Sequence, residues 1–577
     1  MTSHAVKLHH GLFCALALFC GCASRSGSGG GSAAGSFPSR AELLRLGTAP
    51  PPVRTAGGHT LDVERWELAG PLPDELKLAP MATRTSWSDL LQARAASRNG
   101  LVFVSEAMGC ASRELGRFKL ANKVAPGDGL RAFILARCGT GTEHAEISTL
   151  EGAVPADVTD DRVFAEWQKD AGVLIDKSIG GGLRTVGIWF GREGGRAIVI
   201  VTAAPRRVQI DPVAMKPADG KTITITGELL IPAASLRGLV NHGRFEHATC
   251  KANPNVALPR FSLRCPVDAR DSLAWIEVAA FPAGRIVGPQ VLSLLALPDG
   301  TGSAVYERPK TAAAGGASLP EALLAALNGV RVEAGLAPLG LAPRESEVAT
   351  NVAPHYFAAG EGDAPETNAD LVVLGLRAGW DVEGMVRAGL FAAAAVTDTR
   401  EPGALVAAAL DRPSGRETLL DPLVRQVAIG PVLHGDHAAG AVFATYSFFD
   451  RESYDAEAAA LLGRLSKLRA DLHLGAPMLL SGGEKATREA ARAVQRDGRS
   501  PGQALNEALE ATVQQTHAQV NGWFMESATL EDVKFPDALL RTPGLQISLA
   551  IGHHKDPKKA WGAYVIFIVV ANTLTAS

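Results

Sequence analysis

The chain has 577 residues, of which 46% are hydrophobic, so it can form several buried cores, and its length suggests about four domains. Its 57 Lys and Arg residues nearly balance 60 Asp and Glu residues, and the formal net charge is −3. This balance excludes the strongly basic surface typical of nucleic-acid-binding proteins, so we expect no nucleic-acid partner.

Residues 1–22 resemble a bacterial lipoprotein signal. A weakly basic start around Lys7 precedes the apolar run GLFCALALFCG, residues 11–21, which is shorter than the roughly 20 residues of a transmembrane helix. Leu18 stands four residues before Cys22, as in a lipobox. The resemblance implies cleavage before Cys22 and lipidation of this cysteine, so we expect a lipid anchor in the membrane.

Phe19 and Cys20 fit the lipobox poorly, and plain secretory cleavage after Ala23 is the alternative. No acidic residue directly follows Cys22, which favours the outer membrane as the destination of the lipoprotein. A periplasmic or secreted location is the alternative. The next segment, 23–54, begins with a Gly/Ser-rich run that has little to bury, so we expect a flexible linker.

Four cysteines lie downstream of the signal, an even number in a chain that we expect to be exported. Such chains commonly carry disulfides, and pairing of sequence neighbours gives Cys110–Cys138 and Cys250–Cys265. Buried free thiols are the alternative. A four-cysteine zinc site is disfavoured because the sequence contains no C-x-x-C spacing.

Three pairs of apolar, strand-like runs surround Gly- and charge-rich turns, and each pair follows helical segments. These hairpins are expected at residues 185–204, 426–449 and 545–570. The region 206–300 differs, because KTITITGELLI alternates apolar and polar residues and predicts a small immunoglobulin-like β-sandwich. The predicted domains are 55–205, 206–300, 318–450 and 451–577.

The third of these domains contains AGLAPLGLAPR (334–344), then PSGRETLLDP (413–422), then VAIGPV (427–432). This series is similar to the CAP superfamily of cysteine-rich secretory, antigen 5 and pathogenesis-related proteins, also called SCP-like domains. The similarity covers residues 318–450. In residues 55–205 and 451–577 it is weak and degenerate. It implies an α+β fold with up to three CAP-like α-β-α sandwich units, beside the one small β-sandwich.

CAP domains often carry a cleft with two histidines and two acidic residues that can bind a divalent metal. Here Gly415 stands at the position of one cleft histidine, and Trp380 stands at the position of a cleft glutamate. The groups that a metal or a general base requires are therefore missing. We expect no metal, no cofactor and no catalytic residue.

Five residues remain as candidates for a groove. His355 is either a residual cleft ligand or a packed residue near a helix end, and Pro354 beside it predicts that the helix ends or kinks there. Trp380 is followed by Glu383, and Trp523 is followed by Glu526. Both tryptophans are either core residues or the lining of a shared groove.

Five further histidines lie in polar stretches and are expected to be solvated. They are His434 and His437 in one hairpin turn, His553 and His554 in another, and His144 close to Glu146. A base with an orienting acid is the alternative for the last pair. The sequence contains neither a G-x-S-x-G nor an H-E-x-x-H motif.

The sequence thus predicts a non-catalytic binding or scaffolding protein of the cell envelope, with a lipid or an envelope protein as its ligand. The alternative is a divergent extracytoplasmic hydrolase acting on a peptide or cell-wall substrate.

Overall fold

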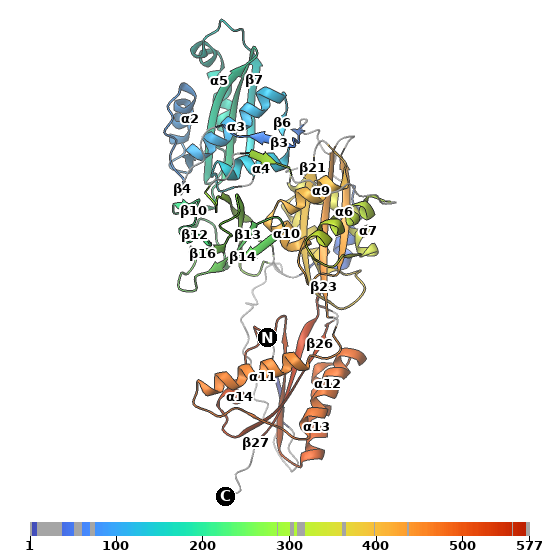
Figure 1. The fold of residues 1–577 in the computed structure, drawn as a ribbon. Coiled ribbons are helices and arrows are strands. Elements are labelled where there is room, and N and C mark those ends of the chain that lie inside the picture. Colours follow the sequence, from blue (N-terminus) through green and yellow to red (C-terminus); the bar gives the residue numbers. More distant parts are fainter. Residues whose placement is uncertain are drawn as a thin grey trace. The chain divides into compact units, whose positions relative to one another are not determined.

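A computed structural model describes most of the chain. The chain divides into two compact units. The N-terminal unit comprises 33–377 and 390–445, and the C-terminal unit comprises 1–32, 378–389 and 446–577. The described residues are 3–7, 37–50, 60–69, 75–142, 144–285, 287–300, 305–308, 318–360, 365–396, 399–434, 438–449, 451–556 and 558–572 (Figure 1).

The structure mixes helices and strands, which confirms the α+β class. Its first module begins after a lead-in of short elements, namely α1 (Arg40–Thr48), β2 (Thr60–Leu61), β3 (Arg65–Glu67) and β4 (Glu75–Leu76). The module itself contains α2 (Ser86–Ala96), β5 (Val102–Val104), α3 (Glu106–Asn122), β6 (Ala125–Pro126), α4 (Asp128–Arg137), β7 (Glu146–Ala153), α5 (Asp160–Ser178), β8 (Arg184–Glu193) and β9 (Arg196–Pro205).

Two four-stranded antiparallel sheets follow and share one hydrophobic core. One has the order β10 (Val208–Ile210), β12 (Thr222–Leu229), β16 (Arg260–Pro266) and β15 (Lys251–Ala252). The other has the order β14 (Glu246–Thr249), β13 (Ser235–His242), β17 (Ala274–Phe281) and β18 (Gln290–Ala296). Alternation along β12 buries Ile223 and Ile225 and turns Thr224 outward, as a half-buried strand requires. Two shorter strands, β11 (Val213–Ala214) and β19 (Val305–Glu307), pair with β4 and β3.

The second module contains α6 (Leu319–Glu333), β20 (Gly340–Leu341), α7 (Pro343–Gly360), α8 (Glu366–Ala378), β21 (Val386–Val396), α9 (Pro402–Leu410), α10 (Pro413–Leu419), β22 (Gln426–His434) and β23 (Ala438–Phe448). Helix α7 continues through Pro354 to Gly360, so the proline does not end it as the sequence suggested. Serine at the N-cap of α6 and Glu321 form a capping box that fixes where this helix begins.

The third module contains α11 (Asp455–Ala470), β24 (Met478–Leu479), α12 (Gly483–Asp497), α13 (Pro501–Thr516), β25 (Val520–Ser527), α14 (Asp537–Arg541), β26 (Leu545–His554) and β27 (Ala563–Asn572). One further strand, β1 (Ser3–Lys7), pairs antiparallel with β25. This strand falls within the predicted signal, whereas Cys22 and the Gly/Ser-rich run lie outside the described residues.

The three modules share one sheet connectivity. The orders are β5-β8-β9-β7, β20-β22-β23-β21 and, apart from β1, β24-β26-β27-β25. In each sheet a short strand runs parallel to the first strand of a hairpin, at β5·β8, β20·β22 and β24·β26.

The same close contact between helix and sheet recurs in every module. A Cβ atom added to Gly187, Gly430 or Gly552 would lie 2.2, 2.4 or 2.8 Å from the backbone of α3, α7 or α12. Because those distances leave no room for a side chain, glycine lets the helix lie directly on the sheet.

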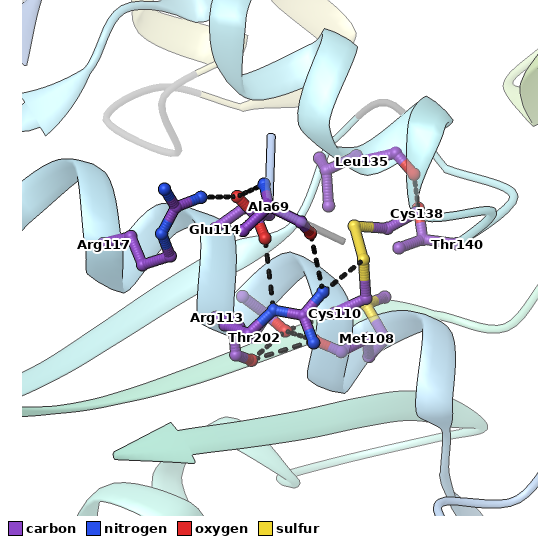
Figure 2. The surroundings of a disulfide bond; sticks show 11 residues. Ala69, Met108, Cys110, Arg113, Glu114, Arg117, Leu135, Cys138, Thr140 and Thr202 are labelled. Carbon is purple, nitrogen blue, oxygen red and sulfur yellow. Dashed lines mark hydrogen bonds and ion pairs between the residues drawn. A yellow bond between two sulfur atoms is a disulfide. The ribbon is translucent and has the colours of Figure 1, made fainter. Parts of the chain in front are cut away.

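Both predicted disulfides are present, as Cys110–Cys138 and Cys250–Cys265. The first joins α3 to the end of α4, beside the buried carboxylate of Glu114 (Figure 2). No described helix is both long enough and apolar enough to cross a bilayer.

Candidate functional site

Gly415, which the sequence comparison with CAP domains placed at the position of a cleft histidine, lies in α10 and is buried. A Cβ atom at Gly415 would lie 1.8 Å from the carbonyl oxygen of Ala409, because α10 packs closely on the end of α9. A side chain of any kind would require the two helices to separate. The packing of α10 on α9 therefore requires glycine at this position.

His355 lies on α7 beneath α1 and is 3% exposed. Burial lowers the pKa of its imidazole, while a hydrogen bond with the backbone of Ala49 opposes that shift. Its Nε2 has no hydrogen-bond partner among the described residues. The structure therefore places His355 under a covering helix, where neither a ligand nor a substrate reaches it directly.

The two tryptophan–glutamate pairs belong to the C-terminal unit, whereas His355 belongs to the N-terminal unit. Trp380 lies under the Nζ atom of Lys555, which is 5.5 Å from its ring centroid, and Glu383 is exposed. Trp523 is partly buried and packs against the core of the third module, and the carboxylate of Glu526 lies 2.7 Å from the Nζ atom of Lys559. Both pairs thus meet the segment between β26 and β27, through two different lysines.

His553, at the end of β26, is buried, although the sequence placed it in a solvated turn. Its ring stacks on Phe449 and meets Tyr454 edge to face, and the Tyr454 hydroxyl lies 3.2 Å from its Nδ1. Tyr564 meets the rings of both Phe449 and Tyr454 edge to face. Burial lowers the pKa of His553 to about 4, so the imidazole is neutral at neutral pH. Its neighbour His554 is more exposed, since successive strand residues point to opposite faces.

His144 and Glu146, the candidate base and orienting acid, follow Cys138 in sequence and make different contacts. The Glu146 carboxylate accepts two hydrogen bonds from the guanidinium of Arg184. His144 contributes its backbone carbonyl to the Thr142 hydroxyl. His437 lies outside the described residues.

Asp411, between α9 and α10, has a strongly raised pKa. It is half-buried, and burial raises the pKa of its carboxyl group to about 7 against the opposing charges of Arg416, Arg412 and Arg308. Its backbone carbonyl accepts a hydrogen bond from the Asn241 side chain of β13. An acid that titrates near neutral pH is a candidate for proton transfer.

The residues after Asp411 attach the second module to the β-sandwich. The Arg412 guanidinium lies 4.9 Å from the ring centroid of Trp275 and 3.6 Å from the Glu277 carboxylate. The Ser414 backbone N–H donates to the same carboxylate. Arg416 donates to four backbone carbonyls, those of Leu410, His242, Gly243 and Glu246. The segment that resembles the CAP cleft motif thus serves as a contact between domains.

Sequence reasoning missed both Asp411 and the aromatic surroundings of His553. The only local signal for the first was an aspartate flanked by Arg412 and Arg416. The aromatic surroundings of His553 had no local signal in the sequence, because Phe449 and Tyr454 lie about 100 residues before this histidine. Across the described ranges, no group of three or more His, Cys, Asp or Glu side chains is arranged to hold a metal ion.

Comparison with known proteins adds no relative. No protein-family model matches the chain, and a search of curated proteins found no match.

Proposed function

We propose that this chain is a lipid-anchored protein of the bacterial outer membrane whose CAP-like modules bind a lipid or an envelope protein without catalysis. The observation that carries the proposal is Gly415. At the position where a CAP domain has its cleft histidine, the Ala409 carbonyl leaves no space for a side chain. The other candidate, His355, is sealed beneath α1.

The membrane anchor rests on the lipobox-like sequence that ends at Cys22. Two disulfides are compatible with an oxidising compartment outside the cytoplasm. The test is Cys22→Ser in the full chain, followed by membrane fractionation and by labelling with an alkyne fatty acid. We expect loss of the label and release from the membrane, and retention of both would contradict the anchor.

The binding role is tested by native mass spectrometry of the full-length protein released from detergent. We expect a bound lipid or a protein partner that is lost on denaturation. A bare mass under every release condition, with turnover of a cell-wall peptide in a parallel assay, would contradict a non-catalytic role.

Asp411 favours the second candidate, a divergent hydrolase, because its pKa of about 7 suits a general base. That function predicts turnover that Asp411→Asn abolishes. Turnover that persists in Asp411→Asn, or no turnover at all, would leave Asp411 as a structural residue at the domain contact.

A further inference from the structure

In the first module, the lead-in segment covers the helix pair α3 and α4. The Trp66 ring packs edge to face on Phe118 of α3, with ring centroids 4.9 Å apart, and Leu68 is buried in the same core. The Ala69 backbone N–H donates to the Glu114 carboxylate of α3 at 3.1 Å, as Figure 2 shows. A segment of the same chain thus occupies this face and is held there through its backbone.

In the second module, helix α1 covers the equivalent pair, α7 and α8. Leu43 of α1 is 1% exposed and lies 2.7 Å from the Cβ position of Gly375 on α8. Gly47 of α1 lies against Asn351 on α7, and the backbone of Ala49 is hydrogen-bonded to His355. A short helix with one leucine anchor therefore fills this groove.

The residues that hold the two covering segments occupy one position in the repeat. The helices come closest to the hairpin glycines at Met108, Ala349 and Ala491, and six residues further along lie Glu114, His355 and Asp497. Glu114 and His355 each bind the backbone of the segment that covers their module. The third module places an aspartate at that position.

Among the residues that the structure describes, no segment occupies the corresponding face of the third module. A hollow of about 420 Å³ lies between α12 and α13, which stand side by side on their sheet (Figure 1). Its floor is made of alanines and its rim of charged side chains, namely Ala486, Ala490, Ala493, Ala504, Ala508 and Ala511 with Glu489, Arg492, Arg496, Asp497, Arg499 and Glu507.

Two charged side chains on the rim are accessible to a ligand. The side chains of Asp497 and Arg492 are exposed, and neither side chain makes a hydrogen bond or an ion pair with any residue that the structure describes. The other rim arginines are engaged, Arg496 with Glu452 and Arg499 with Glu507. The groove thus offers a carboxylate for a backbone N–H and a guanidinium for a carboxylate.

We propose that the groove between α12 and α13 docks a short helical peptide segment of another protein. The segment places a leucine-sized side chain over the alanine floor, a free backbone N–H toward Asp497 and an acidic side chain toward Arg492. Helix α1, nine residues long with Leu43 as its anchor, shows the size of occupant that such a face accepts. This groove lies apart from the cleft positions of the proposed function, so either can fail without the other.

The probe is a synthetic peptide with the sequence of residues 37–50, in which Arg40→Glu and Arg45→Glu supply the acidic side chains. Its binding to the full-length protein in detergent is measured by fluorescence anisotropy. We expect saturable binding, a loss of at least tenfold in affinity in Arg492→Glu, and no measurable binding in Ala493→Trp, which fills the groove. Ala459→Trp on the exposed face of α11 is the matched control and should bind as the wild type does.

The unsubstituted peptide, which carries Arg40 and Arg45, should bind more weakly to the wild type and better to Arg492→Glu. Binding of neither peptide, or binding that Ala493→Trp leaves unchanged, would overturn the proposal. A dimer of the full-length protein in sedimentation that Ala493→Trp dissociates would also overturn it, since the occupant would then be a second copy of the chain.

Discussion

The ring of His553 lies almost parallel to the ring of Phe449, with their centroids 4.9 Å apart and 16° between their planes. Phe449 follows the last strand of the second module, and His553 stands near the end of β26 in the third. The stack excludes water from the imidazole, and this desolvation lowers its pKa to about 4.

This pKa predicts that the third module loses stability in acid. The unfolded chain binds the proton near pH 6.5, whereas the folded protein binds it only near pH 4. The stabilisation is therefore complete above pH 6.5 and is lost as the pH falls to 4, by at most about 3 kcal/mol. Hydrogen exchange of β26 and β27 between pH 7 and 4 measures it. The decline should be smaller in His553→Phe, and equal slopes in the two proteins would contradict the assignment.

Arg469 of α11 is buried and donates to three backbone carbonyls, those of Gly475, Leu539 and Thr542. Arg469→Met leaves these carbonyls without a donor, so we expect a loss of about 3 kcal/mol or more, read from exchange protection of α14. Arg469→Lys should recover only part, because an ammonium lacks the planar fork. Arg541→Lys, on the exposed face of α14, is the control and should change nothing.

Gly430 lets α7 lie on β22, since a Cβ atom there would be 2.4 Å from the Ala349 backbone. Gly430→Ala is expected to destabilise the second module by about 1–3 kcal/mol through overpacking. Gly329 on α6 has open space at its Cβ position, so Gly329→Ala should stabilise the same module by about 1 kcal/mol. Thermal unfolding measures both variants. Changes of the same sign in the unfolding temperatures of Gly430→Ala and Gly329→Ala would contradict the close contact at Gly430.

The Cys110–Cys138 disulfide closes a loop between residues 28 apart in sequence. Removal of the disulfide in Cys110→Ala/Cys138→Ala should lower the free energy of unfolding by about 3–4 kcal/mol, mostly because the unfolded chain gains conformational entropy. Limited proteolysis of the first module measures the loss. In the wild type, thiol labelling of denatured, unreduced protein should leave all four downstream cysteines unmodified. A labelled cysteine would show that its disulfide had not formed.

Asp411 predicts the opposite pH response in the N-terminal unit. Because the folded protein holds this proton up to about pH 7, ionisation lowers stability as the pH rises from about 4 to about 7. Asp411→Asn should leave stability unchanged below pH 4 and raise it at pH 8, by at most about 4 kcal/mol. Exchange protection of residues 402–420 is the readout, and the exposed Asp157→Asn is the control. A less stable Asp411→Asn at pH 8 would show that the ionised carboxylate is needed for packing.

The local pattern predicted the elements better than their partners. Runs of Val and Ile around a Gly-rich turn located the hairpin of β8 and β9, because alternation and turn chemistry are properties of neighbouring residues. The local pattern did not predict that segment 60–69 covers the first module, because its contacts with Phe118 and Glu114 are distant in sequence.

The candidate site shows the same limit. The sequence singled out Gly415 and His355, but it did not predict the helix that covers His355, because α1 lies about 300 residues away in sequence. For His553, a polar neighbourhood in sequence suggested water, whereas Phe449, Tyr454 and Tyr564 surround it in space.

Three sheets with one strand order in a single chain carry a hazard during synthesis, because a strand of one module could pair in the sheet of another. The helix faces counter this exchange, since the first is closed by 60–69 and the second by α1, two segments with different side chains and different anchoring residues. Each of these modules can therefore recognise its own cover as the chain emerges. Their divergence in sequence would then protect correct assembly as well as separate their roles.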